Sequence, residues 1–114
     1  IKTRKVAKCV VMFEFSELCE TPRSQVDYME ISRLYNTVII SNVKQLGQTN
    51  DDAARRFIAL VDEFYERHVT LIISAEKPIT ELYTQGNLNF EFKRCISRLQ
   101  EMQSLEYLAR EHLV

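Results

Sequence analysis

The residues best suited to chemistry in this sequence are two pairs of arginines. Arg94 and Arg98 stand four residues apart, which is one helical turn, and Arg55 and Arg56 are adjacent. An arginine directed at a γ-phosphate stabilises the charge of phosphoryl transfer, whether it comes from the same polypeptide or from a neighbour. We therefore take these four arginines as candidates for a phosphate-sensing site or a subunit interface, with Arg94 and Arg98 as the first choice.

Ordinary ion pairs are the alternative explanation for both pairs. Glu91 and Glu101 flank the later pair and would form a ladder of surface ion pairs with it, each contributing about 0.3 kcal/mol. The earlier pair falls in the first turn of an expected helix, where a cation is slightly unfavourable. Salt bridges to a nearby aspartate would explain its presence equally well, and the candidates are Asp51, Asp52 and Asp62. Spacing alone favours ion pairs over ligand binding.

The sequence has no phosphate loop. The pattern GxxxxGK[ST] is absent, and the two glycines, Gly47 and Gly86, are too few for an equivalent loop. A hydrophobic run ending in Asp62-Glu63 resembles the magnesium-binding strand of P-loop ATPases, but its apolar positions repeat at helical spacing, so we assign it to a helix. We therefore expect no catalytic residue here and no ATP hydrolysis by this chain alone.

The composition makes several other functions improbable. Fifteen basic residues face sixteen acidic ones, so we expect no general attraction to nucleic acid. The three cysteines are widely spaced and only two histidines accompany them, so no zinc or other metal site is predicted. No apolar run approaches the roughly 20 residues of a membrane span, so we expect no transmembrane segment. A cytoplasmic protein with reduced cysteines fits these features best.

The elements that must position the arginines follow an alternating order. Segments 9–15, 37–41 and 69–75 are rich in β-branched and aromatic residues, which predicts strands. Helical periodicity begins near Ser24, Thr49 and Asn89. This order is typical of βαβ units, whose crossovers place the strands in parallel. We predict an α/β fold with a small, mainly parallel three-stranded sheet and helices on both faces.

Long stretches of the sequence resemble the C-terminal part of the ZapE family, bacterial cell-division ATPases with mitochondrial relatives. The stretches extend over about residues 10 to 112, and they are 13–19, 22–28, 36–43, 51–65, 90–94 and 97–104. The resemblance implies that residues 1–114 form a single domain and one part of a P-loop NTPase-like fold. This domain would be a C-terminal fragment of a larger ATPase whose ATP- and Mg²⁺-binding core lies upstream. All four candidate arginines fall on positions of the family's motifs.

The resemblance also implies the cellular setting. It implies a cytoplasmic location at the division site, with the FtsZ division ring and the upstream ATPase part as partners, and it leaves open whether the ATPase forms a homo-oligomer. The expected function is therefore the non-catalytic C-terminal portion of a ZapE-type ATPase that contributes to nucleotide sensing or partner docking. A stand-alone protein–protein interaction domain without a nucleotide role is the alternative.

Overall fold

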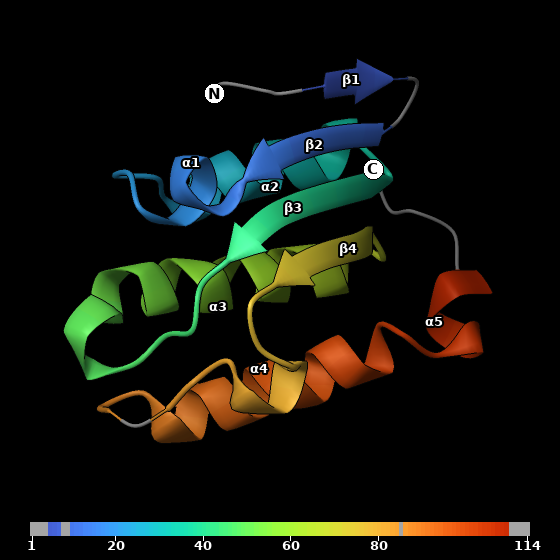
Figure 1. Ribbon diagram of the computed structural model, residues 1–114. Coiled ribbons are helices and arrows are strands. Elements are labelled where there is room, and N and C mark those ends of the chain that lie inside the picture. Colours follow the sequence, from blue (N-terminus) through green and yellow to red (C-terminus); the bar gives the residue numbers. More distant parts are fainter. Residues whose placement is uncertain (1–4, 8–9, 85, 110–114) are drawn as a thin grey trace.

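The computed structural model describes residues 5–7, 10–84 and 86–109 (Figure 1). The described residues form four strands and five α-helices, and helices separate β2, β3 and β4, as in βαβ units. In chain order they are β1 (Lys5–Ala7), β2 (Val10–Glu14), α1 (Phe15–Cys19), α2 (Gln25–Leu34), β3 (Thr37–Val43), α3 (Asp51–Glu66), β4 (Thr70–Ala75), α4 (Asn89–Glu101) and α5 (Leu105–Ala109). Short 3₁₀ turns at Gln48–Asn50 and Ile79–Glu81 precede α3 and α4. No helix in these ranges is long and apolar enough to cross a membrane.

The sheet has the strand order β1-β2-β3-β4. The strands β2, β3 and β4 are parallel to one another, so the predicted α/β class and its three parallel strands are confirmed. The strand β1 was not predicted, and it adds to the edge of β2 in antiparallel orientation. A three-residue strand is too short to show a period-two pattern, which is why the sequence did not reveal it.

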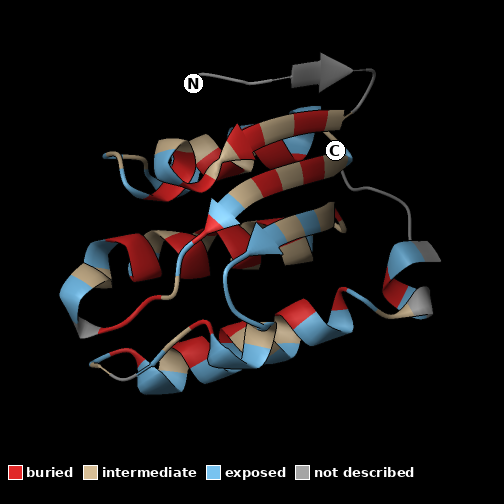
Figure 2. Cartoon of the chain, viewed as in Figure 1, coloured by how far each residue is buried: buried red, intermediate tan, exposed pale blue. Residues whose placement is uncertain are grey.

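The helices cover one face of the sheet, whereas the sequence analysis placed them on both. Burial alternates along the strands, so that Val11 and Phe13 in β2 and Ile40 in β3 are buried while their neighbours are half-buried (Figure 2). The chain lays down β2, β3 and β4 in one direction, and two right-handed crossovers in the same direction put both helical connections on the same side. Among the described residues, no helix lies over the opposite face (Figure 1).

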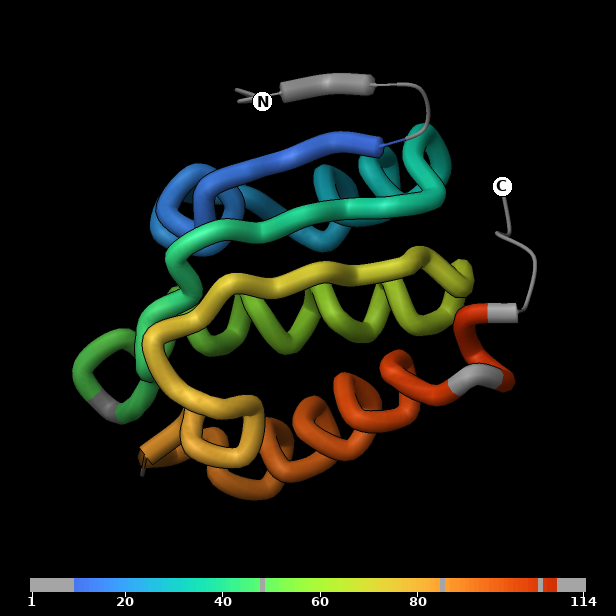
Figure 3. The backbone as a smooth tube through the Cα atoms, turned by 45° about the vertical axis from the view of Figure 1, so that its right-hand side comes forward, coloured from blue at the N-terminus to red at the C-terminus, as the bar shows by residue number. Residues whose placement is uncertain are grey.

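The helix α3 is the centre of the helical layer. It packs against α1, α2 and α4, and α4 runs beside it near the β4 edge of the sheet (Figure 3). The ring of Phe57 lies 6.0 Å from the rings of both Phe15 in α1 and Phe92 in α4. The hydrophobic run that ends in Asp62-Glu63 is therefore helical, as predicted, and its apolar stripe forms the core.

The first residues of α2 and α3 show how far helix starts can be predicted from local sequence. At α2 the prediction is confirmed, because the Ser24 backbone N–H donates to Asp27 Oδ2 at 2.9 Å. The helix α3, which was expected to begin near Thr49, begins after Asn50. The Asn50 side chain instead accepts a hydrogen bond from the Gly47 N–H at 2.7 Å and closes the preceding 3₁₀ turn.

Candidate phosphate-sensing and interface site

The arginines of α4 converge on one carboxylate of α3. Arg98 forms a hydrogen-bonded ion pair with Asp62 Oδ1, and Arg94 Nη2 lies 3.7 Å from Asp62 Oδ2. The ladder of ion pairs expected within α4 is thus replaced by contacts between two helices. Asp62 therefore ties α4 to α3 at the position where both helices reach the surface.

Arg98 is held by more than charge. Its guanidinium lies 5.0 Å from the centroid of the Tyr65 ring, a distance at which cation–π attraction operates. The Tyr65 hydroxyl in turn lies 2.8 Å from Glu101 Oε2 and donates a hydrogen bond to it. With its side chain only 25% exposed, Arg98 is fixed by this set of contacts and holds the two helices together.

Arg94 is held far more loosely than Arg98. Its side chain is 55% exposed, and its 3.7 Å approach to Asp62 is longer than a hydrogen bond. One helical turn earlier, the Phe90 side chain is 80% exposed. The outer face of α4 therefore presents a cation and an aromatic ring side by side to solvent.

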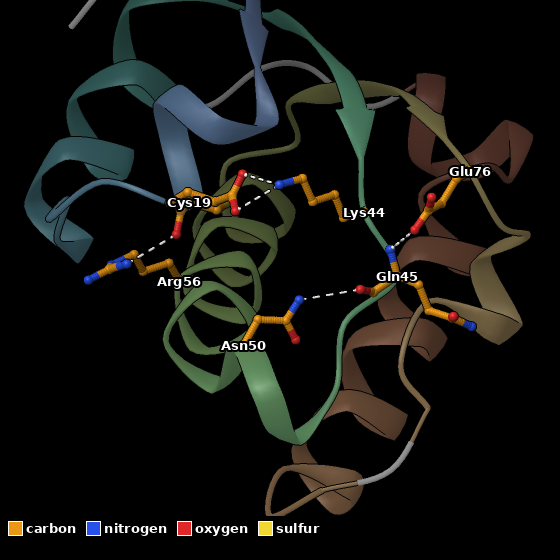
Figure 4. A network of polar contacts seen from close by, with 7 residues as sticks. Cys19, Lys44, Gln45, Asn50, Arg56 and Glu76 are labelled. Carbon is orange, nitrogen blue, oxygen red and sulfur yellow. Dashed lines mark hydrogen bonds and ion pairs between the residues drawn. The ribbon is translucent and has the colours of Figure 1, made fainter.

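The other arginine pair belongs to a different part of the surface. Arg56 Nη1 donates a hydrogen bond of 3.1 Å to the Cys19 carbonyl at the end of α1 (Figure 4). Arg55 is exposed, and seven-residue spacing puts it on the flank of α3 that carries Asp62. The structure thus gives Arg56 a role in joining α1 to α3, and it leaves Arg55 facing solvent near the α4 side.

A polar network closes the carboxyl end of the sheet next to Arg56 (Figure 4). Lys44 Nζ pairs with Glu20 at 3.1 Å, and the Gln45 backbone N–H donates to Glu76 at 2.7 Å. The Asn50 side-chain amide donates to the Gln45 carbonyl at 3.3 Å. These contacts fix the loop after β3 against the end of β4 and the start of α3, so the edge where ligands of open α/β sheets bind is occupied by internal contacts.

Polar residues at the strand ends are also engaged in internal contacts. Asn42, whose φ of 61° places it in the left-handed region, donates from Nδ2 to both Glu14 carboxylate oxygens at 3.1 Å. Beside them lies a shallow cavity of about 260 Å³ between the ends of β3 and β4. Over the described ranges no group of three or more His, Cys, Asp or Glu side chains is arranged to hold a metal ion.

Two buried thiols lie behind these surfaces. Burial, reinforced by the nearby Asp62 carboxylate, raises the pKa of Cys95 to about 12. Burial also raises the pKa of Cys19 far above its ordinary value. Both thiols stay protonated at neutral pH, and a protonated thiol is a poor nucleophile and a poor metal ligand.

Comparison with known proteins identifies the family of this chain. Residues 1–111 match the family model described as AFG1-like ATPase. The chain belongs to the AFG1-like ATPase family. It is similar to the cell division protein ZapE of Escherichia coli K12, with 53% identity over 113 residues, covering 99% of this chain and 30% of that protein. The resemblance to ZapE noted in the sequence is therefore confirmed.

The chain is also similar to eukaryotic proteins, at lower identity. The zebrafish lactation elevated protein 1 homolog B is 34% identical over 125 residues, covering 82% of this chain and 25% of that protein. The chain thus spans about 30% of the length of the bacterial relatives that it matches, and less of the zebrafish one. No solved structure matches the chain.

The sequence suggested the candidate arginines of this AFG1-like chain but did not reveal Asp62, the residue that distinguishes Arg94 from Arg98. Asp62 is more than thirty residues away from Arg94 and Arg98, so no local spacing rule connects them. The one available signal was an acidic residue at the margin of the apolar stripe of α3, which predicts a position facing the neighbouring helix. The loose Arg94 and the fixed Arg98 become distinguishable only once α3 and α4 are packed.

Proposed function

We propose that this chain is the non-catalytic C-terminal part of a ZapE-type ATPase, and that it senses the nucleotide of the parent protein through Arg94. The family match supports an ATPase parent. In the proposal, this parent binds ATP with Mg²⁺. The observation that carries the sensing role is the contrast between the exposed Arg94 and the fixed Arg98 on one carboxylate. In this proposal residues 1–114 act as one domain beside an ATP-binding core supplied by the rest of the parent.

Arg94 can leave Asp62 at little cost. An exposed ion pair contributes less than about 1 kcal/mol, and the gain at a nucleotide phosphate exceeds that amount because guanidinium–phosphate contacts are charge-assisted. Asp62 keeps Arg98 as its counter-ion, so the movement leaves no unpaired charge behind. Arg94 therefore acts as the mobile phosphate sensor, and Arg98 positions the helix that carries it.

The cellular part of the proposal follows the name of the bacterial relative. A relative called a cell division protein supports a role in bacterial division. In the proposal, the parent acts in the cytoplasm at the division site and contacts the FtsZ ring. If the parent forms a homo-oligomer, Arg94 reaches the nucleotide of a neighbouring subunit, which is the arrangement of an arginine supplied in trans.

Partner docking is the second candidate function, and Phe90 is the observation that favours it. Aromatic and arginine side chains dominate the binding energy of protein interfaces, and here Phe90 and Arg94 stand one helical turn apart on an exposed face. In its extreme form this candidate is a stand-alone interaction domain without a nucleotide role. The two candidates use the same surface, but they predict different effects of the same substitutions.

The test is ATP turnover by a chimera in which this chain replaces the matching segment of the Escherichia coli relative. We expect Arg94→Ala to lower kcat by at least about tenfold, because arginines that contact a transferring phosphoryl group contribute that much or more. Arg33→Ala, an exposed arginine on α2, is the matched control and should leave kcat unchanged. Unchanged turnover in Arg94→Ala, together with weaker FtsZ binding in Phe90→Ala, would move the assignment to partner docking.

A second measurement addresses the chain by itself. We expect no binding of a fluorescent ATP analogue to this chain alone, because its sequence has no phosphate loop. Tight binding or turnover by the isolated chain would reveal a site that the arginine surface does not account for, and it would reject the non-catalytic assignment.

A further inference from the structure

The outer edge of β4 carries backbone N–H and C=O groups that have no hydrogen-bond partner among the described residues. The Thr70 N–H donates to the Asn36 carbonyl at 2.9 Å, and the Glu76 N–H donates to the Val43 carbonyl at 3.2 Å. The backbone N–H and C=O groups of the even-numbered residues of β4 therefore point towards β3. Strand geometry then directs the backbone N–H and C=O groups of the odd-numbered residues away from the sheet. These residues are Leu71, Ile73 and Ala75, and within the described ranges their outward groups have no hydrogen-bond partner.

This edge lacks most of the features that normally prevent strand pairing. The one irregularity in the β3–β4 pairing lies between Ile40 and Val43, where the extra residue belongs to β3 and not to β4. Native proteins protect edges with charges, prolines, bulges or very short strands, and β4 has the six-residue sequence TLIISA without a charge or a proline. The opposite edge, by contrast, is the three-residue strand β1. An unprotected apolar edge of this kind is a template for an added strand.

An apolar cleft lies directly under the β4 edge. Its volume is about 260 Å³, and its apolar wall is formed by Leu71, Ile73, Ile79, Leu99 and Met102. Lys77 and Gln103 also line the cleft. Pockets for small ligands begin at about 300 Å³, so this cleft is small for a metabolite. It suits aliphatic side chains that project at alternate positions from a strand lying beside β4.

We propose that an extended segment of the ATP-binding part of the same parent polypeptide adds to the outer edge of β4 and places alternate side chains in this cleft. The inference rests on the proposed parent, and it assigns the surface on which that parent completes the sheet. The chain matches only 30% of the Escherichia coli relative, so most of that protein lies outside the match. A segment of the same polypeptide has a high effective concentration, which favours it over a second copy.

Amide hydrogen exchange in this chain alone and in the chimera tests the proposal. We expect the amides of Leu71, Ile73 and Ala75 to exchange rapidly in the isolated chain and at least about tenfold more slowly in the chimera. The even-numbered amides of β4, which already pair with β3, serve as internal controls and should be protected in both. Rapid exchange of the odd-numbered amides in the chimera overturns the proposal. Protection in the isolated chain that rises with its concentration also overturns it and identifies a second copy as the occupant.

Ala75→Pro provides the matched substitution. Ala75 is exposed, and its outward N–H has no partner in the described chain, so removing that donor should leave the unfolding midpoint of the isolated chain unchanged. In the chimera the same change should restore rapid exchange at Leu71 and Ile73. Loss of stability in the isolated chain would show a folding defect, in which case exchange in the unsubstituted chimera decides the question.

The two proposals fail separately. Exchange at β4 does not depend on Arg94, so protected edge amides together with normal turnover in Arg94→Ala would reject nucleotide sensing and retain the added strand. Lost turnover in Arg94→Ala with unprotected edge amides would do the reverse.

Discussion

At the scale of single residues, Asp62 gives Arg94 and Arg98 different tasks. Arg98 should be the stabilising partner, because it is largely buried and also packs on Tyr65. We expect Arg98→Ala to lower the free energy of unfolding by about 1–3 kcal/mol, since it leaves a partly buried carboxylate with only one distant cation. Arg94→Ala should cost less than about 0.5 kcal/mol, as exposed substitutions do. Urea denaturation of the isolated chain measures both, and equal losses would contradict the division of roles.

Cys95 makes a prediction about pH. Its folded-state pKa of about 12 lies above the ordinary thiol value, so the folded protein holds this proton more tightly than the unfolded chain does. The stabilisation is therefore complete below pH 9 and is lost as the pH rises towards 12, at up to about 1.4 kcal/mol per pH unit. In Cys95→Ala the fall in stability between pH 9 and 10.5 should be shallower. Denaturation at both pH values checks this, and identical slopes would show that Cys95 does not contribute.

At the scale of elements, α5 depends on one side chain. A five-residue helix is not stable alone, and the buried Tyr107 hydroxyl lies 2.7 Å from the Val69 carbonyl oxygen and 3.1 Å from that of Phe64. Tyr107→Phe removes this donor and should cost about 0.5–1.5 kcal/mol. Amide exchange in α5 should accelerate more than exchange in α3, and an equal acceleration of both helices would mean that α5 is no separate unit.

An element could be predicted from the sequence when the residues that determine it are close together in the chain. The helix α3 was predicted because sixteen residues carry a continuous apolar stripe, and β3 and β4 were predicted from their β-branched runs. The strand β1 was not predicted, because three residues are too few to show a period-two pattern. The one-sided helical layer was not predicted either, because the face that the helices cover depends on the order of the strands in the sheet. The arginine candidates were visible in sequence, but the partner that distinguishes them, Asp62, depends on packing between helices.

At the scale of the whole molecule, the sheet face that no described helix covers adjoins the outer edge of β4 (Figure 1). Met12, Ile39 and Ile72 pair in register and form an apolar row across three strands on this face. Parallel sheets are almost always covered on both faces, so we predict that another part of the parent protein covers this row. The side chain of Ile72, which is 50% exposed here, is the point at which that cover can be tested.

Ile72→Lys should therefore act differently in the two contexts. In the isolated chain the lysine can reach water from the uncovered face, so we expect a change in unfolding free energy within about 0.5 kcal/mol. In the chimera the same lysine would be trapped beneath the covering segment, and we expect a loss above about 1 kcal/mol because a charge is then removed from water. Val26→Lys, at an apolar position of α2 that is 69% exposed, is the matched control and should be neutral in both. Thermal denaturation of the four variants measures these effects, and a neutral Ile72→Lys chimera would mean that this face stays open to solvent in the parent.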